Sequence, residues 1–94
     1  MIKIIKSEDN LLEVEILDED KHTIPNLLVK YLLNDERVEY AGYRIPHPLV
    51  SYPRVILRTK ENHKPIDVLK DVIQKILKDV DEFEKVFLKI LLTR

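Results

Sequence analysis

The chain has 94 residues, with 16 lysines and arginines against 17 acidic residues, one glycine and no cysteine. This length is typical of one domain, so we expect residues 1–94 to form a single domain. Without cysteine there are no disulfides, thiolate nucleophiles or cysteine zinc sites. One glycine is too few for the loops that hold phosphates. No apolar run approaches the ~18 residues of a membrane span and the N-terminus has no secretory pattern, so we expect a cytoplasmic protein.

Charge is balanced overall, at −1, but is uneven along the chain. Residues 1–20 hold two lysines and seven acidic residues (2 − 7 = −5), whereas residues 43–64 hold five cations and one glutamate (5 − 1 = +4). Proteins that bind nucleic acid by themselves usually present a basic domain. We therefore expect no direct nucleic-acid binding by the chain alone. The basic residues of 43–64 are either solvated strand and loop charges or a local basic patch.

Apolar and charged residues alternate near the N-terminus with the period of half-buried strands. The pattern predicts strands at about 2–7 and 11–18, joined by a polar hairpin turn. Thr23 is then predicted to be the N-cap of a helix, because its hydroxyl can accept a hydrogen bond from a first-turn amide. Pro25 follows in that first turn, where its missing N–H is harmless. We expect this helix to end at about Asn34.

The second half of the chain predicts two further strands and one long helix. Alternation predicts a strand over 38–43, three prolines between 46 and 53 exclude regular structure there, and 55–59 forms the fourth strand. No glycine or further proline interrupts the chain from Pro65 to about Thr93, which predicts one helix of roughly 40 Å. The order β-β-α-β-β-α predicts an α+β two-layer domain with a four-stranded, mostly antiparallel sheet.

The long helix carries an apolar stripe at alternating spacings of three and four from Ile66 to Ile90, the spacing of a heptad repeat. Strands of five or six residues span only ~17–20 Å, about half of the helix. The remaining turns would expose several large side chains, which soluble proteins usually cover with a partner. We therefore predict a protein–protein interface, with itself or with a different chain, formed by Ile76, Val80, Phe83, Val86, Phe87, Ile90 and Leu91.

Residues suited to catalysis are few. His22, His47 and His63 lack the i, i+4 spacing of a helical zinc pair, and no carboxylate lies on an apolar segment that would raise its pKa. The two serines lack the flanking glycines of a nucleophile elbow. We expect no catalytic residue, no metal and no cofactor, and hence no enzyme activity of the chain by itself. The alternative, a small acid–base enzyme, would require a pocket with His47 or His63 beside a buried carboxylate.

The connection from Ala41 to Leu49 combines the single glycine with two prolines that flank His47. Gly42 would either supply a positive φ or let another backbone approach closely. Each residue before a proline is pushed towards extended conformations. The segment is consistent with a rigid connection between two strands.

Two segments together resemble the archaeal RNA polymerase subunit L family. Asp20 to Leu28 resembles the acidic-His-Thr-x-x-Asn-Leu helix entry of that family, and Val38 to Leu49 resembles its strand and His-Pro-Leu turn. One departure is that Lys21 separates Asp20 from His22, whereas the family usually has the acid directly before the histidine, which puts an acid–histidine pairing in doubt. The residues that match the family motif are His22, Thr23, Pro25, Asn26, Ala41, Gly42, Tyr43, His47 and Pro48.

The resemblance implies a non-catalytic assembly subunit of a DNA-directed RNA polymerase whose active site lies in other subunits. It implies a heterodimer with the larger polymerase component known as the D subunit, comparable to the bacterial α-subunit N-terminal dimer, on which the large subunits assemble. The apolar stripe would pack against an equivalent helix of the D subunit, and the motif residues would fix local geometry or contact the large subunits. A self-associating homodimeric module that uses the same stripe is the alternative.

Overall fold

The computed structural model of the protein describes residues 2–93. It confirms the predicted order of elements, which are β1 (Ile2–Ser7), β2 (Leu11–Ile16), α1 (Thr23–Leu33), β3 (Val38–Arg44), β4 (Arg54–Thr59) and α2 (Pro65–Leu92). The second strand ends at residue 16 and not at 18, because the N–H of Asp18 turns back to the carbonyl of Ile16 at 3.1 Å.

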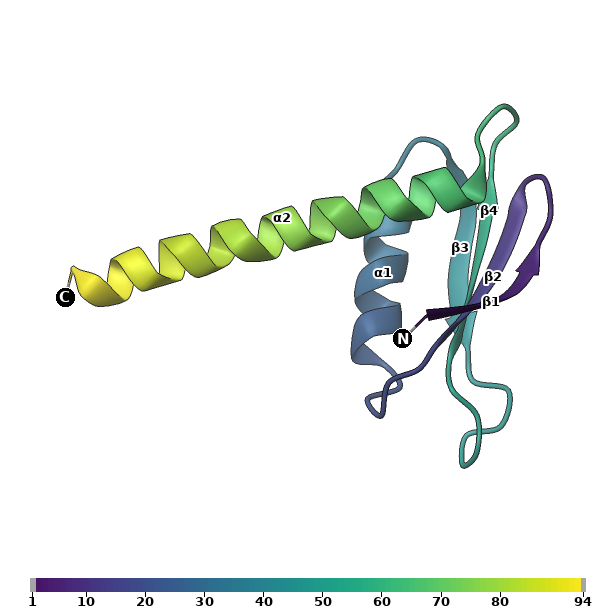
Figure 1. The fold of residues 1–94 in the computed structure, drawn as a ribbon, viewed down its shortest axis with the longest axis horizontal. Coiled ribbons are helices and arrows are strands. Elements are labelled where there is room, and N and C mark those ends of the chain that lie inside the picture. Colours follow the sequence, from purple (N-terminus) through teal and green to yellow (C-terminus); the bar gives the residue numbers. More distant parts are fainter. Residues whose placement is uncertain (1, 94) are drawn as a thin grey trace.

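The four strands form one sheet in the order β1-β2-β4-β3, and every neighbouring pair is antiparallel. Successive side chains of a strand point to opposite faces, so Leu12 and Val14 of β2 share a buried face with Val55 and Leu57 of β4. Both helices lie on this face (Figure 1). Within residues 2–93 no helix covers the opposite face.

The core lies between the sheet and the two helices. Its most buried members are β2 and β4 side chains together with Leu28 and Leu32 of α1 and Val68, Leu69 and Val72 of α2. Thr59 is the buried polar residue of the described chain, and it is satisfied because its hydroxyl donates to the His63 carbonyl at 2.7 Å and accepts from Asn10 Nδ2 at 3.3 Å. These bonds fix the turn through which β4 enters α2.

The start of α1 differs from the prediction that Thr23 is its N-cap. Thr23 is already the first helical residue and His22 is at the N-cap position, and the Oδ1 of Asp20 accepts the N–H groups of these two residues at 3.0 Å each. The Thr23 hydroxyl donates to Asp20 Oδ2 at 2.5 Å. Hydrogen bonds from the hydroxyl and then the amide of Thr23 lower the pKa of Asp20 to about 2. An ionised carboxylate has two oxygens with about four acceptor sites, whereas a threonine hydroxyl has a single oxygen with two.

Helix α2 packs on the sheet only through its beginning. Its buried residues are Pro65, Val68, Leu69 and Val72, and the rest of the helix projects away from the domain (Figure 1). The molecule therefore measures 50 × 37 × 17 Å although the chain is short.

Candidate protein interface

The projecting part of α2 exposes a continuous apolar face. Phe83 is 70 % exposed, and its ring stacks on that of Phe87 with a centroid distance of 6.0 Å. Of the seven residues predicted from sequence to form an interface, Val80, Phe83, Val86, Phe87, Ile90 and Leu91 are exposed, whereas Ile76 is half-buried against the core. We call the face formed by Leu77 and these six exposed residues the α2 stripe.

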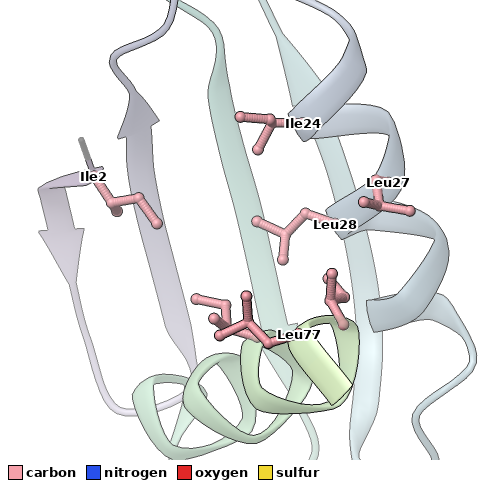
Figure 2. Close-up of a pocket in the computed structure, with 7 residues that line it drawn as sticks. Ile2, Ile24, Leu27, Leu28 and Leu77 are labelled. Carbon is pink, nitrogen blue, oxygen red and sulfur yellow. The ribbon is translucent and has the colours of Figure 1, made fainter. Parts of the chain in front are cut away.

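At the base of the α2 stripe is an apolar cavity of about 220 Å³. Figure 2 shows the side chains that line it arriving from β1, α1 and α2. They are Ile2, Ile24, Leu27, Leu28, Ile73, Ile76 and Leu77. Ile24 and Leu27 are exposed by about two-fifths each, so the apolar surface continues from α2 onto α1.

Sequence reasoning missed the contributions of Ile2, Ile24 and Leu27 to this surface. The alternation pattern predicts a half-buried first strand, but this was wrong, because all six residues of β1 are exposed. The helical spacing likewise suggests that Leu27 faces the core, whereas it is 39% exposed. One feature of the sequence indicates this wider apolar surface. Helix α1 has more large apolar residues than its buried face holds, because Ile24, Leu27 and Leu33 accompany the buried Leu28 and Leu32.

Two polar contacts hold the projecting helix at its angle. The Tyr31 hydroxyl of α1 donates to Asp79 Oδ2 of α2 at 2.8 Å, and this bond raises the pKa of Tyr31. Arg37 binds Asp35 through Nε at 3.0 Å and Nη2 at 2.8 Å, and reaches Asp71 Oδ2 through Nη1 at 2.9 Å. Hydrogen bonding to Arg37 lowers the pKa of Asp35.

The two sequence segments that carry the family resemblance meet in space. His22 Nδ1 lies 3.0 Å from the Tyr43 hydroxyl, and the rings meet edge to face. Lys21 Nζ donates to the Pro48 carbonyl at 2.8 Å. Asp20 bonds to the backbone of His22, and the imidazole instead has Tyr43 as its partner. The residue inserted before the histidine thus ties the helix entry to the Pro-His-Pro turn.

The other motif residues divide between the core and the surface. Pro25 and Ala41 are buried, whereas Asn26, His47 and Pro48 are exposed. Gly42 has no positive φ, so that expectation was wrong. Its side-chain position is instead taken by Tyr40, because a Cβ at Gly42 would lie 2.7 Å from the Tyr40 hydroxyl oxygen. The close approach is made by a side chain and not by another backbone.

The described histidines and the cavity do not form a site suited to acid–base chemistry. All three histidines are exposed, and the cavity is lined by apolar side chains alone. The pocket that the enzyme alternative requires, with His47 or His63 beside a buried carboxylate, is therefore not the cavity found here. Within residues 2–93 there is no group of three or more His, Asp or Glu residues placed to hold a metal ion. In the same part of the chain, none of the helices has the length and apolar character needed to cross a membrane.

A small sheet covered on one face by helices, one of which carries an unpaired apolar stripe beyond its own core, defines a protein–protein interaction domain. A sequence profile of the RNA polymerase Rpb3/Rpb11 dimerisation domain matches residues 11–86. The chain belongs to this family, as the two resembling segments predicted.

Its relatives include archaeal and eukaryotic polymerase subunits. DNA-directed RNA polymerase subunit Rpo11 of Methanocaldococcus jannaschii is 41% identical over 88 residues, covering 85% of this chain and 88% of the relative. Subunit RPB11 of DNA-directed RNA polymerase II from Schizosaccharomyces pombe is 34% identical over 76 residues, or 81% of this chain and 62% of that protein. The crystal structure of subunit L from Thermoplasma acidophilum matches with a TM-score of 0.82 and 29% identity, over 95% of this chain and 86% of that one.

Proposed function

We propose that this chain is a non-catalytic assembly subunit of DNA-directed RNA polymerase that forms a 1:1 heterodimer with the larger D subunit. The observation that carries the proposal is the exposed α2 stripe on a projecting helix, in a chain that belongs to a family of dimerisation domains. The heterodimer would be a platform for the large subunits, which hold the active site.

The proposed interface begins where the chain's own core ends. Leu69 and Val72 are 4% and 3% exposed, whereas Val80 and Phe83 are 55% and 70% exposed. Full burial of each large apolar side chain contributes roughly 1.5–3 kcal/mol of favourable free energy. A helix of the partner laid along the α2 stripe would bury its seven exposed apolar residues, which supports an obligate rather than a transient contact.

The cavity at the base of the α2 stripe supplies a socket for the partner. A volume of about 220 Å³ is larger than the ~150 Å³ apolar cavity that accepts a benzene molecule. An aromatic or large aliphatic side chain of the partner helix would therefore fit between α1 and α2, against Leu28 and Ile76. Buried anchors of this kind carry most of the binding energy in protein interfaces.

The motif residues support a second contact, with the large subunits. His22, Thr23 and Tyr43 have partners within the chain, so they hold the helix entry against β3. The side chains of Asn26, His47 and Pro48 are exposed and make no hydrogen bond within residues 2–93. We assign the first group to local geometry and the second to the contact surface.

Co-expression with the D subunit of the same organism, followed by gel filtration, tests the heterodimer. We expect a stable 1:1 complex that is lost in the Phe83→Asp and Phe87→Asp variants, because a buried unpaired charge in an apolar interface is costly. Gln74→Asp is the matched control, since it adds the same single negative charge at an exposed position of the same helix outside the α2 stripe. If the unaltered chain forms no complex with the D subunit, the proposal fails.

A homodimer remains the second candidate because the apolar face of α2, extended to the half-buried Ile73 and Ile76, can pair with itself. If two copies pack antiparallel about a two-fold axis between Val80 and Phe83, Phe87 of one copy faces Ile76 of the other, and Ile90 faces Ile73. Every pair in this register is apolar, and no polar residue in the stripe selects a different partner. Sedimentation of the purified chain with and without the D subunit distinguishes the two candidates. A homodimer that persists when the D subunit is added would favour the second candidate.

A further inference from the structure

The face of the sheet opposite the helices has an excess of positive charge. The strand register places Lys3, Glu15, Arg54 and Arg44 in one row across the four strands. The next rows place Glu13 beside Lys6, and Arg58 beside Tyr40. On the paired positions of this outer sheet face, five cations (Lys3, Lys6, Arg44, Arg54 and Arg58) thus stand against two glutamates, Glu13 and Glu15.

The glutamate side chains of the outer sheet face are less exposed to solvent than the Arg44 side chain. The Glu13 and Glu15 side chains are 15% and 17% exposed, against 58% for Arg44. Lys6 is already paired with Glu8 in the adjoining turn at 3.2 Å, whereas Arg58 has no ion pair within residues 2–93. An approaching molecule therefore meets cations first.

The arginines on this face form only long ion pairs with the glutamates and no close hydrogen bonds. Arg54 approaches Glu15 at 3.7 Å and Glu13 at 3.8 Å, and Arg44 approaches Glu13 at 3.7 Å. These distances exceed the ~2.7–2.9 Å of a charge-assisted hydrogen bond. Arg54 Nε and Glu13 Oε2 are buried without any hydrogen-bond partner. The buried Arg54 Nε is not accessible to another molecule, whereas the guanidinium of Arg44, 58% exposed and 3.7 Å from Glu13, keeps N–H donors for the carboxylates of one.

Tyr40 completes the surface. It is 53% exposed, and its hydroxyl reaches across to Gly42 in the same strand, next to Arg58 on the neighbouring strand. Tyrosine and arginine are the side chains enriched in protein interfaces, whereas lysine is depleted. The combination favours a protein partner.

We propose that the outer sheet face is a second docking surface, and that it binds an acidic, glutamate- or aspartate-rich segment of a protein. Separate carboxylates of such a segment can each reach a guanidinium fork. A nucleic-acid backbone is disfavoured because Glu13 and Glu15 occupy the middle of the face and the chain carries a net charge of −1. A four-stranded sheet of this size offers less than the ~800 Å² per partner of a stable interface, so the contact adds to another one and weakens with salt.

Titration of the isotope-labelled full chain with a glutamate homopeptide at low salt, followed by NMR, tests the proposal. We expect shifts concentrated at Tyr40, Gly42 and Arg58. Arg58→Glu is expected to weaken binding about fivefold, which is the effect of one exposed charge pair. Arg58→Gln, checked for folding by circular dichroism, is expected to have a smaller effect in the same direction.

The control is Lys70→Glu, which makes the same change in net charge on α2, on the other side of the sheet. We expect it to leave the affinity within twofold. The proposal is overturned if Lys70→Glu and Arg58→Glu weaken binding equally, if the shifts spread over α2, or if a single-stranded thymidine oligonucleotide binds the same face more tightly at the same salt. None of these results bears on the heterodimer with the D subunit, which uses the opposite side of the molecule.

Discussion

The hydroxyl of Tyr31 donates a hydrogen bond of 2.8 Å to the carboxylate of Asp79, and this bond joins α1 to the part of α2 where the helix leaves the domain. Asp79 lies seven residues beyond Val72, the last buried residue of α2. The bond therefore acts at the point where apolar packing on the sheet no longer holds the helix. Together with the Arg37–Asp71 pair, it links the projecting helix to the rest of the domain.

Tyr31→Phe is expected to loosen the projecting helix without unfolding the domain. The variant keeps the ring and removes only the donor. Amide hydrogen exchange should accelerate around residues 74–82 and stay unchanged in β2 and β4, because those strands form the core. Unchanged exchange in α2 would show that apolar packing alone holds the helix.

The same bond predicts a pH dependence at the alkaline end. The bond to Asp79 raises the pKa of Tyr31 above its ordinary value of 10.0 in the folded chain, so the neutral phenol is favoured by folding. Its contribution to stability is complete below pH 10 and disappears as the pH rises through the folded value. The difference in melting temperature between the unaltered chain and Tyr31→Phe should be constant near pH 8 and shrink above pH 10. A difference that grows above pH 10 would contradict this assignment.

Asp20→Ala is expected to destabilise the start of α1 and to remove part of the acid sensitivity. The folded pKa of Asp20 is about 2, against an ordinary value of 3.8. Its contribution is therefore complete above pH 4 and is lost as the pH falls towards 2. Melting temperatures at pH 6 and pH 2.5 should differ less for Asp20→Ala than for the unaltered chain. Asp9→Ala is the control, because Asp9 has no side-chain hydrogen bond within residues 2–93, and it should behave like the unaltered chain.

Leu32→Ala and Phe87→Ala are expected to separate the internal core from the α2 stripe. Leu32 is 0% exposed and Phe87 is 51% exposed. Removing a buried leucine side chain costs about 2–5 kcal/mol of unfolding free energy, whereas an exposed substitution usually changes it by less than ~0.5 kcal/mol. Urea denaturation at concentrations where the chain is monomeric measures both. Equal losses would place Phe87 in the monomer's own core.

Gly42→Ala is expected to displace Tyr40 rather than to break the strand. The atom nearest to the new Cβ would be the Tyr40 hydroxyl oxygen at 2.7 Å, the far end of an exposed side chain. Stability should therefore change little, while the NMR signals of the Tyr40 ring shift. In a Tyr40→Ala background the same substitution should stabilise the strand by about 0.5–1 kcal/mol, because alanine restricts the unfolded chain more than glycine does. Destabilisation in both backgrounds would show that the backbone itself requires glycine.

Much of the fold could be predicted from the sequence because its signals are local. Alternation in residues 11–16, the prolines between 46 and 53, and the uninterrupted stripe after Pro65 each specify a segment without reference to the others. The excess length of α2 over a short strand was enough to predict exposed apolar turns. The start of α1 was misassigned because Asp20 and Thr23 are both residue types that cap helices, and only the backbone path decides which side chain reaches the free amides.

The sequence by itself determined the element order, the α+β class, the over-long apolar helix and the family, because periodicity, breakers and motif residues act over short stretches of chain. The tertiary structure alone decided the strand order β1-β2-β4-β3, the cavity among Ile2, Leu28 and Leu77, the bond from Tyr31 to Asp79 and the positive outer sheet face. Each of these joins residues that are distant in the chain. Their proximity depends on how the strands pair and how the helices pack on the sheet, which is a property of the whole folded chain and not of any one segment.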